Sequence, residues 1–429
     1  MIFRLKPLFI FCTFLLTAIL HAQEKAILIY ESTSAQQSAE ETSIFINPAN
    51  PAQIVAGSNI NFVFNSQDSG KTWEAKRIKS TYGVWGDPCI LADATGRFYY
   101  FHLSDPTGKN WRSKELLDRM VCQRSDDGGK TWDDGTFFAN HHPKDQDKEW
   151  AAVSPNTNNV AVTWTQFDKY GSKDSVDKSN ILFTLSEDQG ATWRETIQIN
   201  ELSGDCLDGD QTTEGAVPCF GPSGEIYVAW AFDEKIYFDY SLDKGNSWQA
   251  KDIFVANQNA GWDFDIAGIA RCNGMPISAC DISQGPKKGT IYLCWGDKET
   301  DSTNADVWFT SSKDGGIHWE PALRIAADSN KRDQFMPWMC VDPINGAVHI
   351  VFYDRSRFPN NNTDIVLASS FDGGQTWQNE RLNKRPSMLT GNVFIGDYIN
   401  ISAHNGMVRP IWTEYHDGLT SIWTALLKF

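Results

Sequence analysis

An eight-residue pattern, Ser-x-Asp-x-Gly-x-Thr-Trp, occurs six times in this chain of 429 residues, and it constrains the fold more than any other feature. The fourth and fifth copies replace the threonine by Ser247 and His318. The tryptophans that end the copies are separated by 59, 61, 55, 71 and 58 residues. A repeat of this length fits one four-stranded blade of a β-propeller with long loops. The tryptophans are Trp73, Trp132, Trp193, Trp248, Trp319 and Trp377.

The residue types of the repeated pattern indicate a tight turn between two strands. An aspartate accepts hydrogen bonds from backbone N–H groups two or three residues later, and glycine adopts a positive φ without strain. The hydroxyls satisfy further turn groups, and the tryptophan packs inward between sheets. Six scattered copies cannot share one active site. We therefore interpret the pattern as structural.

The number of blades follows from the segments around each copy. Three apolar segments precede the pattern and a fourth follows it, with inner strands expected from Ile44, Asp87, Trp150, Ala216, Ile266 and Phe335. Residues 397–429 provide three further segments without a copy. We expect residues 26–30 to supply the missing outer strand and so to close the ring and cover its edges. This predicts an all-β, seven-bladed propeller of four-stranded antiparallel blades; six blades is the alternative, because residues 271–289 are irregular.

The N-terminus is typical of a signal peptide. Arg4 and Lys6 precede an apolar run from Leu8 to Leu20, and Ala22 is a small residue before the expected cleavage. We predict residues 1–22 as the signal peptide and 23–429 as a single propeller domain, secreted or periplasmic. No later stretch has the roughly 20 apolar residues of a transmembrane helix. We expect a monomer without a transmembrane segment.

Composition narrows the class of partner. The chain has 38 Lys and Arg against 54 Asp and Glu, a formal net charge of −16. Such a charge disfavours nucleic acid and bare anionic membranes as partners. The aromatic content of 13%, with 17 tryptophans, exceeds ordinary usage, and exposed aromatics can stack on sugar rings. We expect a glycan or another exported macromolecule as partner.

Eight cysteines follow the predicted signal peptide. Four of them, Cys89, Cys219, Cys272 and Cys340, are expected at matching places in four repeats, which favours packing as buried thiols. Disulfides between close pairs are the alternative in an oxidising compartment, for instance Cys206 with Cys219 or Cys272 with Cys280.

The turn pattern occupies one face of a propeller, so longer functional loops are expected on the opposite face. Two acidic sets fall there by register. One precedes or opens the inner strands and lines the channel mouth: Asp87, Glu149, Glu214, Asp265, Asp333 and Asp397. The other ends the second strands: Asp105, Asp168, Asp233, Asp297, Asp354 and Asp417.

Converging carboxylates raise one another's pKa unless a cation compensates. We expect Arg271, Arg332, Arg355 and Arg357 as counter-charges. Ca²⁺ is possible at such an oxygen-rich face, although no dedicated calcium loop is present and no cofactor is required. The histidines show no metal spacing, which argues against zinc.

The six repeats, the predicted signal peptide and three stretches resemble the BNR-repeat (Asp-box), sialidase-like secreted propellers over residues 40–429. The stretches are GTIYLCWGD (289–297), HIVFYDRSR (349–357) and FIGDYINISAHNGMVRPIW (394–412). These motifs are specific for the fold and weak for the activity, because other hydrolases and receptors contain them.

In true sialidases three arginines bind the substrate carboxylate, a tyrosine paired with a glutamate is the nucleophile, and an aspartate is the acid/base. The resemblance places Glu214 at the glutamate position, and Tyr398 with Glu414, or Tyr353 with Arg355, as nucleophile and clamp. This chain departs from the pattern. The Arg-Ile-Pro phrase is absent from residues 42–48, and the apolar residues 228–231 replace an expected arginine.

Two function classes follow. The first is an exported propeller that recognises a glycan or another macromolecule without hydrolysis. The second is a glycoside hydrolase, sialidase-like or acting on neutral sugars, that uses channel-mouth carboxylates. Its catalytic candidates are Glu214, Tyr398, Glu414 and Asp87, and the ligand-binding candidates are Glu149, Asp265, Arg271, Arg332, Asp333, Tyr353, Arg355 and Asp397. A dense negative face repels sialic acid and favours a neutral sugar.

Overall fold

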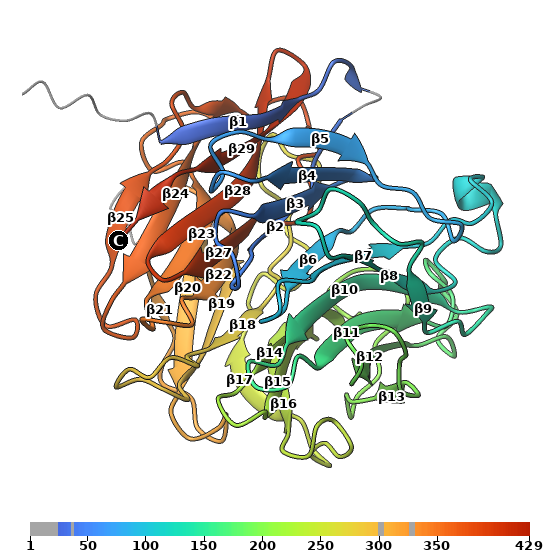
Figure 1. Cartoon of the computed structure of the whole chain (residues 1–429). Helices are drawn as coiled ribbons and strands as arrows, with labels where there is room; N and C mark the ends of the chain where they lie inside the picture. The colour runs from blue at the N-terminus through green and yellow to red at the C-terminus, as the bar shows by residue number, and fades with distance from the viewer. Residues whose placement is uncertain (1–24, 36–37, 299–303, 326–330) are drawn as a thin grey trace, which may run out of the picture.

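Seven antiparallel sheets follow one another along the chain, each built on a path of four strands (Figure 1). The computed structural model describes residues 25–35, 38–298, 304–325 and 331–429. The predicted signal peptide lies outside these residues. The seven-bladed propeller is therefore confirmed, and the six-bladed alternative is wrong.

The strands of blades 1 to 4 follow chain order from the inner to the outer edge. Blade 1 contains β2 (Ser43–Ile46), β3 (Ile54–Ser58), β4 (Phe62–Ser66) and β5 (Glu74–Arg77). Blade 2 contains β6 (Cys89–Ala92), β7 (Phe98–Leu103), β8 (Met120–Ser125) and β9 (Thr136–Phe138), with the 3₁₀ helix η2 (Asn110–Arg112) between β7 and β8. Blade 3 contains β10 (Asp145–Val153), β11 (Val160–Phe167), β12 (Ser179–Ser186) and β13 (Ile197–Gln198), and blade 4 contains β14 (Glu214–Phe220), β15 (Ile226–Phe232), β16 (Lys235–Ser241) and β17 (Ile253–Asn257).

Blades 5 and 6 repeat this order, and blade 7 borrows its outer strand from the N-terminus. Blade 5 contains β18 (Ile277–Cys280), β19 (Ile291–Lys298), β20 (Ala305–Ser312) and β21 (Leu323–Arg324). Blade 6 contains β22 (Gln334–Val341), β23 (Val348–Asp354), β24 (Asn362–Ser370) and β25 (Gln378–Arg381), and β26 (Ser387–Met388) also pairs with β24. Blade 7 contains β27 (Asn400–His404), β28 (Met407–His416), β29 (Leu419–Ala425) and β1 (Ala26–Glu31), and β30 (Leu427–Lys428) also pairs with β28.

The first strands of neighbouring blades make an unbroken ring of contacts, from β2 through β6, β10, β14, β18 and β22 to β27 and back to β2. The ring is closed at blade 7, where Ala26 pairs with Ala425 and Leu28 with Trp423. The backbone N–H of Ser32 continues this pairing with a hydrogen bond to the carbonyl of Thr420. The predicted closure by residues 26–30 is confirmed.

Most residues of the inner three strands of a blade are buried on both faces of the sheet. All eight residues of β11 are buried, because each face of the sheet packs against a neighbouring blade. The outer strand β5, with the sequence EAKR, is mostly exposed. The core is thus divided into layers between blades, and the polar groups of the outer strands face solvent.

The repeated turns have the expected structure. In the third copy the Ser186 hydroxyl donates to the Asp188 carboxylate at 2.8 Å and accepts the N–H of Gly190 at 2.8 Å. The same carboxylate accepts the N–H of Thr192 at 2.8 Å and its hydroxyl at 2.6 Å. In the fifth copy Gly316 has φ +92°, and a Cβ there would lie 2.1 Å from the ring of Phe238 in the preceding blade. Glycine therefore lets the turn press against the neighbouring sheet.

The prediction for blade 5 is wrong in one respect. Its inner strand is β18 (Ile277–Cys280) and does not begin at Ile266. Residues 258–276 form a loop, tied by bridges from Asp263 to Asn273 and from Ile269 to Val393. Ile266 and Ile269 are buried in the core. The loop is therefore as apolar as a buried strand, although its backbone does not pair with β19 as an inner strand would.

Cys272 consequently lies in this loop and not in an inner strand, which corrects the expectation of matching cysteine positions. Cys219 and Cys340 do share a place, one residue before the ends of β14 and β22, whereas Cys89 opens β6. The eight cysteines within the described residues are all free. No helix in the described part of the chain is long and apolar enough to cross a membrane.

Candidate functional site

The inner strands begin with a kink that recurs around the ring. The pairing register of β10, β14 and β22 shifts near its start, and Lys148, Gly215 and Met336 at these shifts have φ of 57°, 73° and 48°. Asp87, just before β6, also has a positive φ, 51°. A bulge of this kind redirects the side chains around it. The start of each blade therefore differs from the regular pleat of its middle.

Three aromatic side chains from distant blades meet in the channel. Trp150 of β10 lies 4.1 Å from Trp338 of β22 and 4.9 Å from Tyr398, which precedes β27, measured between ring centroids. Trp338 and Tyr398 are 5.9 Å apart. Because blade 3 is not a neighbour of blade 6 or 7, these contacts cross the ring. They fill the channel with a buried aromatic cluster.

An ion-pair network lies beside this cluster. The Lys148 ammonium contacts the Asp397 carboxylate at 2.7 Å and the Asp87 carboxylate at 3.4 Å. Arg271 donates from Nε to the other Asp397 oxygen at 2.6 Å and contacts Asp208 at 3.6 Å. Five regions of the chain thus share one network across the channel mouth.

Lys148 and Asp397 favour each other's charged form. Burial by itself would raise the pKa of Asp397, but Lys148 and Arg271 outweigh burial and hold this pKa at about 2. Burial by itself would lower the pKa of Lys148, but Asp397 and Asp87 raise it well above its ordinary value. Each charge is thereby kept by its partners.

Other acids of the channel mouth have no cation of their own. Burial is the largest cause that raises the pKa of Asp147 to about 7 and the pKa values of Glu41, Glu149 and Glu214 well above their ordinary range. Both carboxyl oxygens of Glu149 and one of Glu214 are buried without a hydrogen-bond partner within the described residues. Burial thus favours the protonated form of these glutamates.

A cavity of about 290 Å³ opens above the network. Trp111, 64% exposed, stacks on Tyr170 at 5.7 Å and meets Trp85 edge-on at 6.5 Å, so one wall is aromatic. The phenol of Tyr170 donates to Asp208 at 2.7 Å, which joins this wall to the network. Charged and polar groups complete the lining: Glu40, Glu41, Asn59, Asp87, Asp147, Lys148 and Arg271.

The cavity lies on the predicted face. Its aromatic residues belong to loops between second and third strands or before first strands, opposite the repeated turns. Of the predicted residues, the structure brings Asp87, Arg271 and Asp397 into one network. Glu149 and Glu214 are buried close by: Glu149 interacts electrostatically with Asp87 and Asp147, and Glu214 with Asp208 and Asp147.

The remaining predicted residues lie apart from this site or are bonded elsewhere. Asp265 is exposed. Asp333 pairs with the fully buried Arg355 at 3.4 Å. Arg332 donates to the Asn360 carbonyl at 2.8 Å, and the Arg357 guanidinium pairs with Asp364 at 2.7 Å.

The two tyrosine pairs suggested by the resemblance are not joined by hydrogen bonds. The Tyr398 hydroxyl is buried without a partner in the described residues. Glu414 instead accepts hydrogen bonds from Trp412 at 2.9 Å and His416 at 3.0 Å. The Tyr353 hydroxyl donates to the Thr413 carbonyl at 2.8 Å, so it is held in the core between blades 6 and 7.

Sequence reasoning missed Lys148, Asp147, Tyr170 and Trp111. A lysine two residues before the predicted inner strand from Trp150 gave only a weak signal, because its burial, and hence its need for anionic partners, follows from the longer strand β10 that the structure shows. Trp111 carries no such signal, since its loop has no recognisable pattern. Within the described residues no group of three or more His, Cys, Asp or Glu side chains is arranged to hold a metal ion. Ca²⁺ binding stays a prediction.

No family model matches the chain, and no curated protein sequence matches it. Solved structures do. The PL25 ulvan lyase bound to -[GlcA(1-4)Rha3S]- is similar with a TM-score of 0.56 at 12% identity, over 91% of this chain and 94% of the lyase. The NanB sialidase from Streptococcus pneumoniae has a TM-score of 0.52 at 11% identity, over 93% of this chain and 85% of the sialidase. A Dyadobacter fermentans protein of unknown function has a TM-score of 0.51 at 15% identity, over 80% of this chain and 97% of that protein.

At these identities the likeness shows the fold alone. The chain shares its propeller fold with a sialidase and a polysaccharide lyase, as the resemblance led us to expect. Membership of the BNR-repeat family stays a prediction.

Proposed function

We propose that the protein binds a neutral carbohydrate chain at the channel mouth without cleaving it. The observation that carries this proposal is the exposed Trp111, stacked on Tyr170 above a cavity whose floor is hydrogen-bonding and charged. Amphipathic aromatic rings suit the apolar faces of sugars, and polar groups at the base suit their hydroxyls. With residues 1–22 as a signal peptide, recognition would take place outside the cytoplasm.

The charges of the site favour a neutral ligand. Lys148 and Arg271 are the cations of the network, and both are already engaged by Asp397. Additional acids line the cavity, and the chain as a whole is acidic. An anionic sugar would meet repulsion without a free arginine to bind its carboxylate. Two proteins that share the fold are named for action on glycans, which accords with a carbohydrate ligand but does not bear on its charge.

The test compares Trp111→Ala with Phe254→Ala, which removes an exposed aromatic from the outer strand β17 of blade 4. A glycan array identifies a neutral oligosaccharide, and calorimetry measures its Kd. We expect Trp111→Ala to weaken binding at least about tenfold and the control to leave it unchanged. Equal affinity in wild type and Trp111→Ala would contradict the proposal.

Hydrolysis of a neutral glycoside is the second candidate, and one observation favours it. Asp147, with a pKa of about 7, and Asp87 both line the cavity, so an acid able to donate a proton lies beside a second carboxyl group. Chromogenic glycosides distinguish the candidates. Turnover that is lost in both Asp147→Asn and Asp87→Asn would establish a hydrolase, whereas binding without turnover supports recognition alone.

A further inference from the structure

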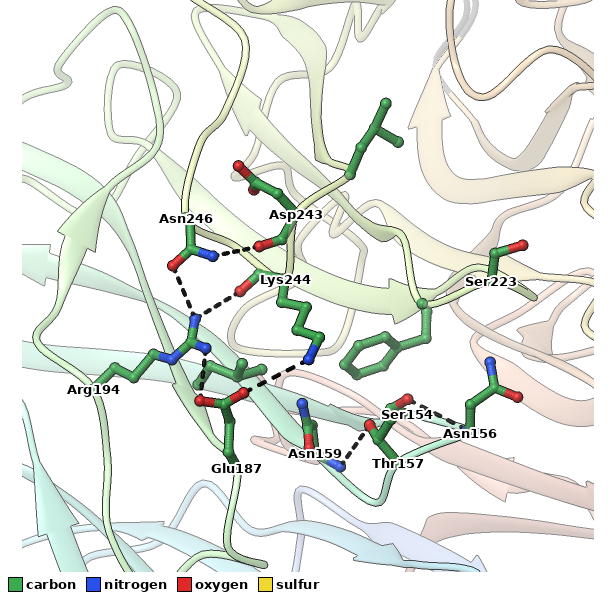
Figure 2. A pocket seen from close by; sticks show the side chains of 14 residues that line it. Ser154, Asn156, Thr157, Asn159, Glu187, Arg194, Ser223, Asp243, Lys244 and Asn246 are labelled. Atoms are coloured by element: carbon green, nitrogen blue, oxygen red, sulfur yellow. Dashed lines mark hydrogen bonds and ion pairs between the residues drawn. The ribbon is translucent and has the colours of Figure 1, made fainter.

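A second and larger cavity, of about 470 Å³, opens on the other face of the ring, between blades 3 and 4 (Figure 2). One side is formed by the turn between β10 and β11, with Ser154, Asn156 and Thr157, and by Ser223 in the corresponding turn of blade 4. The opposite side is formed by residues of the repeated turns and the segments that follow them: Glu187, Arg194, Lys244 and Asn246. The proposed channel-mouth site does not use any of them.

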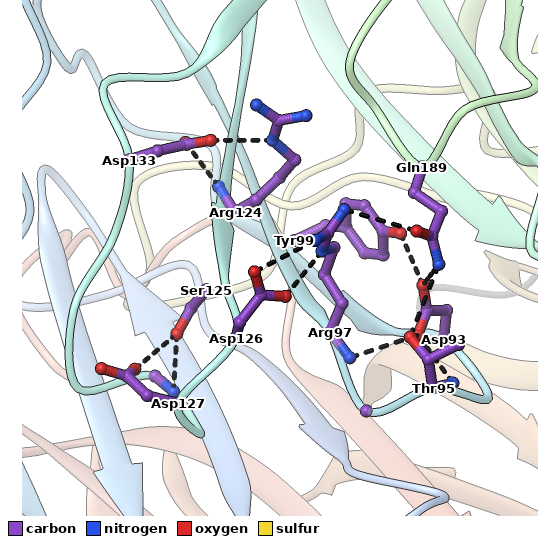
Figure 3. A network of polar contacts seen from close by, with 12 residues as sticks. Asp93, Thr95, Arg97, Tyr99, Arg124, Ser125, Asp126, Asp127, Asp133 and Gln189 are labelled. Atoms are coloured by element: carbon purple, nitrogen blue, oxygen red, sulfur yellow. Dashed lines mark hydrogen bonds and ion pairs between the residues drawn. The ribbon is translucent and has the colours of Figure 1, made fainter.

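The repeats themselves provide the comparison that explains this cavity. Between blades 2 and 3, the Arg97 guanidinium pairs with Asp126 at 2.7 Å (Figure 3). Gln189, from the repeated turn of blade 3, reaches across and donates to Asp93 at 2.9 Å. Arg97 also donates to the Gln189 amide oxygen at 3.4 Å. Long polar side chains thus bridge the two blades at this boundary.

The same positions hold different residues one blade later. Asn159 immediately precedes β11 as Arg97 immediately precedes β7, and Lys244 is the fourth residue of its repeat as Gln189 is of the preceding one. Asparagine is too short to reach Glu187, the counterpart of Asp126. Glu187 pairs instead with Arg194 at 2.7 Å and Lys244 at 3.9 Å. Arg194, which donates to the Lys244 carbonyl at 3.0 Å, and Lys244 thus bridge blades 3 and 4 by a different route, and the space beside Asn159 stays open.

The lining of this cavity offers hydrogen bonds and little net charge. Asn159 is only 7% exposed, and its side-chain amide has no hydrogen-bond partner within the described residues. Arg194 and Lys244 balance Glu187 and Asp243 among the lining charges. Phe220 and the 70% exposed Leu242 add apolar surface. Amides, hydroxyls and apolar patches in a charge-balanced cavity match a neutral polyhydroxylated ligand.

We propose that this cavity is a second carbohydrate-binding site, which takes a neutral sugar and acts independently of the channel mouth. Its volume falls within the range of small-ligand pockets, roughly 300–1,000 Å³. The unpartnered amide of Asn159 supplies a donor and an acceptor to adjacent hydroxyls. The inference stands on the comparison between blades and therefore does not require the channel-mouth proposal to hold.

Saturation-transfer NMR with D-glucose, D-galactose, D-mannose and L-rhamnose tests the proposal on wild type, Trp111→Ala and Asn159→Arg. Asn159→Arg restores the residue found at Arg97, which would pair with Glu187 and occupy the cavity. We expect transfer to at least one sugar in wild type and in Trp111→Ala, and its loss when Asn159→Arg is added to Trp111→Ala. Absence of transfer in Trp111→Ala, or transfer that survives the added Asn159→Arg, would overturn the proposal.

A second pair of variants tests the same proposal if Asn159→Arg does not fold. Lys244→Gln places at this turn the residue of the preceding repeat, and Ser223→Ala removes an exposed hydroxyl; neither touches the core. In the Trp111→Ala background, we expect the two changes together to weaken the Kd of the responding sugar at least about tenfold. An unchanged Kd would contradict the site. A weakened Kd here, with channel-mouth binding retained in the Trp111-containing protein, separates the two proposals.

Discussion

At the scale of single residues, the carboxyl groups of the channel mouth differ in whether a cation reaches them. Asp397 is paired with Lys148 and Arg271, and its pKa is lowered to about 2 despite burial. Glu214 has the Thr165 hydroxyl as a donor to one oxygen and nothing for the other among the described residues. Two acids predicted from the same register therefore make opposite contributions to stability.

We expect Asp397→Asn to lower the free energy of unfolding at pH 7 by about 3–5 kcal/mol, because it leaves the buried Lys148 with only Asp87 at 3.4 Å. The folded pKa of Asp397 lies below its unfolded value, so its stabilisation is present above the unfolded pKa and is lost as pH falls toward about 2. Chemical denaturation at pH 7 and pH 3 should show the difference shrinking. The exposed Asp265→Asn is the control; an equal effect of both changes would contradict the assignment.

We expect Glu214→Gln to have the opposite sign. Burial raises the folded pKa of Glu214, so the stability that the protonated group provides at low pH is lost as pH rises. Glutamine keeps the acceptor for Thr165 and does not ionise. The variant should be about 1–2 kcal/mol more stable than wild type at pH 8, with a smaller difference at pH 5. Parallel pH profiles of Tm for the two proteins would show that Glu214 does not titrate in this range.

At the scale of elements, the repeated turn is a conserved geometry used in six blades rather than a functional group. Its serine and glycine are buried, as in Ser186 and Gly190, whereas the carboxylate of Asp188 is exposed. The carboxylate therefore orders the turn by three hydrogen bonds at the surface, not in a buried pocket. Variation at other positions of the turn changes how the neighbouring boundary is bridged: Gln189 donates to Asp93 of blade 2, whereas Lys244 pairs with Glu187 of blade 3.

We expect Asp188→Ala to lower the free energy of unfolding by about 1–2 kcal/mol, because the turn loses its acceptor while water replaces part of it. Carbohydrate binding at the channel mouth should be unchanged per folded molecule, since the turn lies on the opposite face. Thermal melts and calorimetry together check both parts, with the exposed Glu195→Ala as control. Loss of binding without loss of stability would show a functional role for the turn.

At the scale of the whole molecule, the ring depends on one strand from the far end of the chain. β1 covers the edge of β29, and Tyr30 packs on Phe62 of blade 1 with ring centroids 4.5 Å apart. The strand thus joins the last blade to the first. An open ring would expose both the unpaired edge of β29 and part of the apolar layer beneath it.

Deleting residues up to Glu31 should cause aggregation or a large fall in Tm, whereas a protein that begins after residue 22 should match the full-length chain. Size-exclusion chromatography with light scattering detects aggregation, and thermal melts report stability. A soluble and equally stable protein that begins near Ser38 would contradict the role of β1 in closing the ring.

The sequence by itself determined the propeller, its seven blades, the closure by residues 26–30 and the geometry of the repeated turns. These features follow from local turn chemistry and from the spacing of the sequence repeat, which can be read without knowledge of the tertiary contacts. It misplaced the inner strand of blade 5 because an apolar loop and a buried strand share composition. Comparison of the repeats shows that Asn159 and Lys244 replace Arg97 and Gln189 of the preceding blade. The cavity beside them could not be inferred from this comparison, because its size depends on the positions of the side chains in the folded protein.

Only the tertiary structure decided which acids are charged. Lys148 and Asp397 are 249 residues apart, and Arg271 reaches the same carboxylate from a loop that precedes blade 5. A carboxylate's ionisation depends on burial and on cations within a few ångströms, and neither is encoded in its register along a strand. The aromatic wall of Trp111, Tyr170 and Trp85 was likewise assembled from three separate loops, because the adjacent blades 2 and 3 direct these loops to the same face.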